Sequence, residues 1–203
     1  MLNSTITKTQ KWLEDIIIGH NFCPFAKKEF VQSRIRFSLF EYKPIEEKAA
    51  SSRFPSIRSS ARAPLKTEQL FEQALTFLMK EVDILDNQSE TETTLLIFDK
   101  HFSQFDEFLD IVDVANHFLE QSDYLGVYQL ATFHPQYLFE GEAPTDASNY
   151  TNRSPYPMLH LLRESSIERV LEQYLDPEDI PHQNIKKARE LGVEYFRTFL
   201  SSL

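Results

Sequence analysis

The sequence predicts an α/β fold, in which a small, mostly parallel sheet of about three strands is packed with helices in a single domain. A chain of 203 residues is long enough for one ordinary hydrophobic core and too short to require two. Its β-type segments are separated by helical patterns, and a helix between two strands favours parallel neighbours joined by right-handed crossovers. Ligands of such folds usually bind beyond the carboxyl ends of the strands.

The first 42 residues predict a helix, a short helical turn and a strand. Apolar residues share one face of a helix over 5–18, and Gly19 is a natural stop. Pro24 suits the first position of a short helix that runs toward Phe30. Residues 34–42 partly alternate and are rich in strand formers, which predicts the first strand.

Residues 43–66 predict a mobile basic loop. They hold six lysines and arginines together with several serines and prolines, and they show little periodicity. The segment is either a solvated insertion or a docking arm for an anionic partner.

The remaining chain predicts two more strands among helices. Thr67 can cap a helix over 68–85, and residues 93–98 form a continuous β-type run that reads as a buried strand. A helix over 104–121, a strand over 127–133 and a long polar loop over 134–154 follow. A helix over 155–174 and terminal helices near Pro181 and Gly192 complete the expected elements.

Composition excludes several classes of protein. The net charge of −10 argues against general nucleic-acid binding, which needs a positive surface. Only four glycines are present and they are far apart, so neither a dinucleotide-binding fingerprint nor a P-loop exists in the chain. Cys23 is the only cysteine, the start of the chain does not resemble a signal peptide, and no apolar run approaches a membrane span. We therefore expect a cytoplasmic protein without membrane contact.

Three motifs resemble a known family. Residues 18–26 (IGHNFCPFA), 133–141 (FHPQYLFEG) and 149–157 (NYTNRSPYP), the last running on to residue 164, are similar to the motifs of the family called domain of unknown function 1415. The similarity continues through residues 180–185 and so covers nearly the whole chain. His20 and Gln136 depart from the family pattern, which usually has an apolar and an acidic residue there. The resemblance implies a bacterial cytosolic protein and supplies no activity.

The expected helix after Ser154 predicts an anion site. Ser154 is a good N-cap residue, and free backbone N–H groups together with the helix dipole would face Arg153 and the preceding loop. A helix N-terminus flanked by arginines suits a phosphate or carboxylate. Alternatively, the arginines pair with acidic residues or tie down the loop. The expected helix surface carries Tyr156, His160, Arg163 and, four residues after His160, Glu164.

Cys23 is a candidate nucleophile. It precedes Pro24 at the expected start of a short helix, a position that favours the thiolate, and Lys27 and Lys28 would add to this effect. The alternative is a small buried residue between Phe22 and Phe25.

His134 and His160 flank the long loop and are candidate general acids or bases, with Glu164 or Asp146 to orient them. They could instead be structural histidines, or join Cys23 in a zinc site, although no close pair of metal ligands supports zinc. No cofactor is expected otherwise. Tyr137, Tyr156, Asp146, Asn149 and Asn152 belong to the same region and are either substrate contacts or residues that shape the loop.

These features favour an enzyme, a hydrolase or group transferase that acts on a small anionic metabolite. Arg153 and Arg163 would hold the anion, and one histidine would move a proton. The alternative is a non-catalytic metabolite-binding or protein-interaction module, in which the terminal helices could form a homodimer surface.

Overall fold

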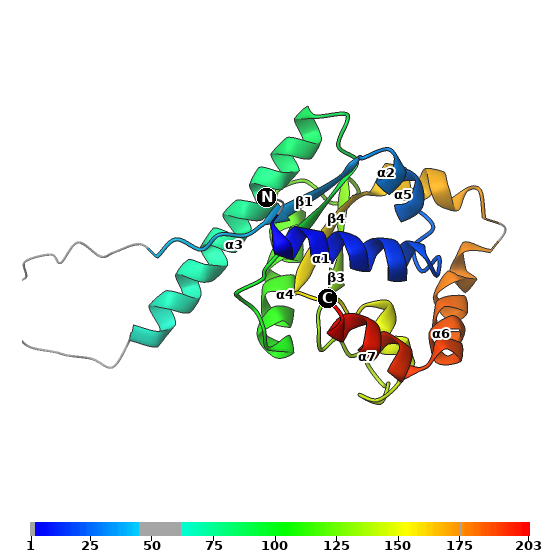
Figure 1. Ribbon diagram of the computed structural model, residues 1–203. Coiled ribbons are helices and arrows are strands. Elements are labelled where there is room, and N and C mark those ends of the chain that lie inside the picture. The colour runs from blue at the N-terminus through cyan, green and yellow to red at the C-terminus, as the bar shows by residue number, and fades with distance from the viewer. Residues whose placement is uncertain (1–2, 45–61, 175) are drawn as a thin grey trace, which may run out of the picture.

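The computed structural model describes residues 3–44, 62–174 and 176–203. Its centre is a four-stranded mixed sheet with the strand order β1-β2-β4-β3 (Figure 1). The strands are β1 (Ile35–Leu39), β2 (Thr93–Ile97), β3 (Tyr128–Phe133) and β4 (Met158–Arg163). β1 and β2 are parallel, whereas β4 is antiparallel to both of its neighbours.

Helices cover both faces of this sheet. They are α1 (Ser4–Trp12), which continues as the π-helix η1 (Leu13–Ile18), α2 (Ala26–Val31), α3 (Arg62–Asn87), α4 (Phe105–Gln121), α5 (Glu164–Leu171), α6 (Ile180–Leu191) and α7 (Val193–Ser201). Two 3₁₀ turns, η2 (Ala147–Thr151) and η3 (Pro177–Asp179), lie in the connections.

Alternation along β2 shows how the two faces are divided. Leu96 packs with α3 and α4, whereas Leu95 and Ile97 pack with α1, η1 and α7. The molecule therefore has three layers, with one hydrophobic core on each side of the sheet (Figure 1). All five residues of β2 are buried, as expected of a strand covered on both faces.

The α/β fold class is confirmed, and the helices expected over 5–18, 68–85 and 104–121 are present. The expectation of a mostly parallel sheet is wrong in detail, because β4 inserts between β2 and β3 and runs antiparallel to both. The basic loop expected over 43–66 lies largely outside the described residues, and residues 62–66 form the first part of α3.

The helix expected over 155–174 is wrong in its first half. Residues Met158–Arg163 form the strand β4, and only Glu164–Leu171 are helical. β4 is a central strand, so both of its faces need apolar side chains, and the resulting continuous run does not alternate. Such a run cannot be distinguished from a buried helix by periodicity alone. Ser154 consequently caps no helix, and its hydroxyl donates to the carbonyl of Tyr156 (2.6 Å).

The end of the first helix positions the turn that carries Cys23. The π-helix η1 ends at Gly19, where a Cβ atom would lie 2.3 Å from the carbonyl oxygen of Asp15, so only glycine fits. Asn21 follows with a left-handed φ of 56°, a conformation that asparagine tolerates. The chain thereby turns back, and the backbone N–H of Phe22 donates to the carbonyl of Ile17 (2.9 Å).

Candidate functional site

His134 is buried on the α4 side of the sheet, and both of its ring nitrogens are engaged. Nδ1 accepts a hydrogen bond from the backbone N–H of Gln136 (3.0 Å), so Nε2 carries the proton and donates to the carbonyl of Phe102 (2.9 Å). The rings of Phe105 and Phe108 flank the imidazole. Burial lowers the pKa of His134, and the ring is therefore a neutral link between the end of β3 and the loop before α4.

His160 lies on the opposite face, in the middle of β4. Its Nε2 atom is 2.8 Å from the hydroxyl of Thr93, which itself donates to the carbonyl of Leu161 (2.6 Å). The imidazole must then be the donor in the first of these bonds. Burial lowers the pKa of His160 to about 3. The sheet therefore separates the two histidines, and each has a partner inside the protein.

The two arginines of the expected anion site bind carbonyl groups. Arg153 donates to the carbonyls of Tyr137 and Pro144, both at 3.0 Å, and stacks over the ring of Tyr150. Arg163 donates to the hydroxyl of Tyr128 (3.0 Å) and to the carbonyls of Leu85 and Thr91. Arg153 thus holds the loop before η2, and Arg163 joins the end of α3 to β3 and β4.

The polar residues of the long loop hold that loop together. Asn149 is fully buried; its Oδ1 atom accepts from the N–H of Phe139 (2.9 Å), and its Nδ2 atom donates to the carbonyls of Ala143 and Asp146. Asn152 donates to the carbonyl of Thr132 (3.0 Å) and so attaches the loop to β3. The amide groups of Asn149 and Asn152, which the sequence predicts to be either substrate contacts or loop-shaping residues, therefore have partners within the protein.

Asp146 holds the same loop in place through an ion pair with Arg189. Arg189 on α6 binds its carboxylate at 3.1 and 3.2 Å, and the N–H of Ser148 donates to it at 2.8 Å. The Arg189 guanidinium, followed by Ser148, lowers the pKa of Asp146 to about 2. Asp146 therefore fastens η2 to α6. Tyr137 packs on Phe105 and Phe139, Tyr156 packs on the core beside α1, and Glu164 begins α5.

Cys23 lines a cleft of about 320 Å³ that we call the apolar cleft. It is lined by Phe22 and Cys23, by Ala131 and Phe133 of β3, and by Phe139. Ile17, Thr151, Asn152, Pro181, Asn184 and Ile185 complete the lining. The thiol is therefore surrounded mainly by carbon atoms.

The surroundings of Cys23 favour the neutral thiol. Although the residue as a whole is partly exposed, burial raises the pKa of its thiol, and the backbone N–H groups of Ala26 and Phe25 only partly offset this effect. The helix start does lower the pKa of the thiol, as the sequence suggested, but desolvation is the larger influence.

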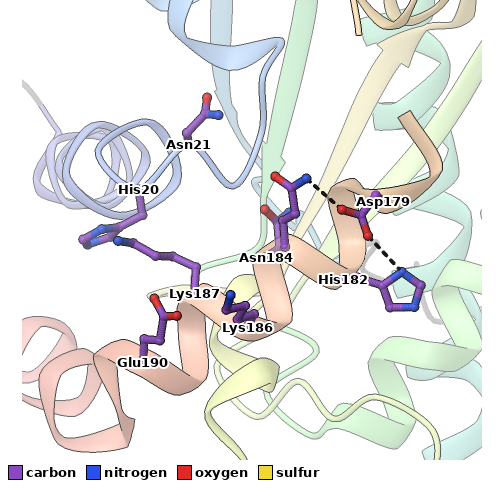
Figure 2. Close-up of a pocket in the computed structure, with 9 residues that line it drawn as sticks. His20, Asn21, Asp179, His182, Asn184, Lys186, Lys187 and Glu190 are labelled. Carbon is purple, nitrogen blue, oxygen red and sulfur yellow. Dashed lines mark hydrogen bonds and ion pairs between the residues drawn. The ribbon is translucent and has the colours of Figure 1, made fainter. Parts of the chain in front are cut away.

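A second cleft, of about 590 Å³, adjoins the first; we call it the polar cleft. The turn after η1 contributes His20 and Asn21, and one side of α6 contributes Asn184, Lys186, Lys187 and Glu190 (Figure 2). Asp179 lies at the other end and is engaged by Gln183 (2.8 Å) and His182 (3.6 Å). The free charged groups are therefore concentrated toward His20.

His20 and Lys187 point toward one another from the two walls of the polar cleft (Figure 2). The Nε2 atom of His20 lies 2.8 Å from the hydroxyl of Tyr195. Burial lowers the pKa of His20, and the positive charge of Lys187 lowers it further. Within the described part of the chain, neither Lys186 nor Lys187 forms an ion pair.

The described residues contain neither a cluster of metal-ligating side chains nor a helix that could span a membrane. No group of three or more His, Cys, Asp or Glu side chains among residues 3–44, 62–174 and 176–203 is arranged to hold a metal ion. In the same part of the chain, every helix is too short or too polar to cross a membrane.

Comparison with known protein families places the chain in one of them. A sequence model described as "Protein of unknown function (DUF1415)" matches residues 4–54 and 52–198. The chain belongs to the DUF1415 family. No curated protein and no solved structure matches it. The family membership of this DUF1415 protein confirms the resemblance predicted from the motifs.

The segments that carry the DUF1415 resemblance meet at the apolar cleft. The cleft is lined by Phe22 and Cys23 from the first motif, Phe133 and Phe139 from the second, Thr151 and Asn152 from the third, and Pro181, Asn184 and Ile185 from the last segment. The structure thus brings Cys23 together with Asn152, while His134 lies across the sheet among the side chains of α4.

Sequence reasoning did not select the polar cleft of this DUF1415 protein. Its basic groups, Lys186 and Lys187, directly follow residues 180–185, the last segment that resembles the family. The position of these lysines next to a family-like segment was the one signal in the sequence that pointed to this cleft. An adjacent lysine pair on a terminal helix otherwise looks like an ordinary solvated surface, because the facing His20 is more than 160 residues away in sequence.

Proposed function

We propose that this protein binds a small anionic metabolite in the polar cleft. The observation that carries the proposal is the approach of the Lys187 ammonium group to His20 across the cleft (Figure 2). Two groups that can both be positive face the same space, and an anion placed between them would relieve their repulsion. We further propose that the protein acts in the cytoplasm.

Charge within the cleft supports an anion at the end beside His20. Asp179 is engaged at the far end by Gln183 and His182, whereas Lys187 is the charged residue that shifts the pKa of His20. Glu190 lies beside the lysines and would oppose an anion, but the charge acting on His20 is positive. Asn21 also lines the cleft.

The binding test uses NMR titration with inorganic phosphate at pH 6. We expect the amide resonances of His20, Asn21 and Lys187 to shift, and Lys187→Met to weaken binding at least tenfold, with Lys100→Met as an exposed control outside both clefts. Because an anion favours the protonated imidazole, the affinity should rise as the pH falls, and His20→Gln should flatten this dependence. Equal phosphate affinity in Lys187→Met and the control would refute the proposal.

A second candidate is a thiol-dependent hydrolase or group transferase, favoured by the position of Cys23 in the wall of the apolar cleft. The raised pKa of Cys23 means that the thiolate is scarce near neutral pH, so a bound substrate would have to supply part of the activation.

For this candidate, stoichiometric alkylation of Cys23 with iodoacetamide should abolish hydrolysis of p-nitrophenyl acetate and phosphate esters, and Cys23→Ser should do the same. A fully alkylated protein that still turns over these esters at the original rate would exclude Cys23 as the nucleophile. A protein that hydrolyses none of them before alkylation leaves binding as the supported function.

A further inference from the structure

We propose that the ligand is an amphipathic anion, with its charged group in the polar cleft and its apolar part in the apolar cleft beside Cys23. This inference rests on the proposed function and specifies the class of molecule that the site takes. It combines two spaces that differ in chemistry and share a wall.

The shared wall is built from helix α6 and from the turn after η1, which a hydrogen bond joins. Asn184 lines both clefts, and its Nδ2 atom donates to the carbonyl of Phe22 (2.7 Å). On one side of this bond, His20 and Asn21 face the polar cleft; on the other side, Phe22 and Cys23 face the apolar cleft. One turn of four consecutive residues therefore serves both spaces, and a single small molecule that lies across Asn184 reaches both.

The apolar cleft has the size and lining of a subsite for a hydrocarbon group. Its volume is about 320 Å³, and a dry cavity of about 150 Å³ holds one benzene ring. Phe22, Phe133, Phe139 and Ile185 are among the apolar residues that line it. Such a space gains little from a purely ionic ligand such as phosphate, but it stabilises each methylene group that is removed from water.

The polar cleft supplies the complementary half. Lys187 and His20 face the position of the anionic group, and neither lysine of this cleft is neutralised by an ion pair within the described residues. An apolar pocket with a small number of convergent polar groups is the usual form of a small-molecule site. Because the polar cleft would hold the charged group and the neighbouring apolar cleft the hydrocarbon part, we expect the ligand to be an acyl, alkyl or aryl chain that ends in a carboxylate or phosphate.

The experiment compares inorganic phosphate with methyl, butyl and hexyl phosphate by isothermal titration calorimetry. Because burial of a methylene group contributes about 0.8 kcal/mol, the affinity should rise about three- to fourfold for each added methylene that enters the cleft. In parallel, hexyl phosphate should slow the alkylation of Cys23 by iodoacetamide at least fivefold, whereas inorganic phosphate at saturation should leave the alkylation rate unchanged.

Two variants separate the halves of the site. Ala131→Leu fills the apolar cleft from β3 and should remove the gain from chain length while phosphate affinity stays the same; Ile185→Phe fills it from α6 and replaces Ala131→Leu if that variant does not fold. Lys187→Met should weaken every member of the series by a similar factor.

The outcomes distinguish this inference from the proposed function. If inorganic phosphate binds at His20 and Lys187, but hexyl phosphate binds no more tightly and does not protect the thiol, the inference is overturned and the proposed function stands. If neither phosphate nor any alkyl phosphate binds, both are overturned. If hexanol protects Cys23 as well as hexyl phosphate does and Lys187→Met changes nothing, the site is apolar only and the anion is not recognised.

Discussion

Single buried side chains hold the long loop between β3 and β4 in place. Asn149 is the clearest example, since its amide group satisfies one backbone N–H and two carbonyls from three positions in that loop. Its complete burial leaves no water to replace those bonds. A residue of this kind determines the geometry of the loop, and in a sequence a turn-forming asparagine cannot be distinguished from a substrate contact.

Asn149→Ala should lower the free energy of unfolding by about 1–3 kcal/mol, because the backbone N–H of Phe139 loses its acceptor and the carbonyls of Ala143 and Asp146 each lose one donor. Urea unfolding followed by circular dichroism measures the change. Asn87→Ala is the matched control: Asn87 is exposed, makes one hydrogen bond within α3, and should cost less than about 0.5 kcal/mol. A loss at Asn149 no larger than at Asn87 would show that the loop is held by other contacts.

At the scale of elements, the sequence predicted what local patterns specify and missed what depends on distant partners. The long helices α3 and α4 were predictable because each has an apolar stripe of helical period facing the sheet. The strand β4 was not, since its buried run lacks alternation and becomes a strand only through pairing with β2 and β3.

In the candidate site, too, local features were predictable from the sequence and contacts with distant residues were not. The motif around Cys23 was predictable from Pro24 and the following helix, and it does line a cleft. The role of Arg153 and Arg163 was not, because a guanidinium group can donate to backbone carbonyls as well as to an anion, and Arg163 donates to the carbonyl of Leu85. Only the three-dimensional arrangement decides which partner is present.

Arg163 connects elements, and its replacement should act on several of them together. We expect Arg163→Met to destabilise the protein by about 2 kcal/mol, because the carbonyls of Leu85 and Thr91 and the hydroxyl of Tyr128 lose a charged donor. Hydrogen exchange should accelerate at the end of α3 and the start of β3. Arg163→Lys, which keeps the charge but not the planar fork, should recover only part of the loss. Exchange that is unchanged in both variants would contradict this role.

At the scale of the whole molecule, the buried histidines make stability depend on pH. The folded protein keeps His160 neutral down to a pKa of about 3, whereas an unfolded histidine takes up a proton near pH 6.5. The unfolded state therefore binds more protons between these values, so stability falls as the pH drops below about 6.5 and this contribution levels off below about 3. Burial lowers the pKa of His134 as well, which acts in the same direction.

For His160 alone, the loss between pH 7 and pH 5 should be about 2 kcal/mol. The measurement compares urea unfolding of the protein and of His160→Gln at both pH values. The variant is expected to be less stable at pH 7 but to lose about 2 kcal/mol less on acidification. Parallel losses in the two proteins would mean that other groups govern the acid sensitivity.

The π-helix at the end of the first helix has a consequence for the position of Cys23. Such a segment accommodates one residue more than a regular α-helix does over the same length. If the same six residues, Leu13–Ile18, adopted α-helical geometry, every later residue of the turn would rotate by about 100° about the helix axis. The sulfur atom would then leave the cavity, and the imidazole of His20 would no longer face Lys187. The register of a single helix thus aligns both halves of the candidate site.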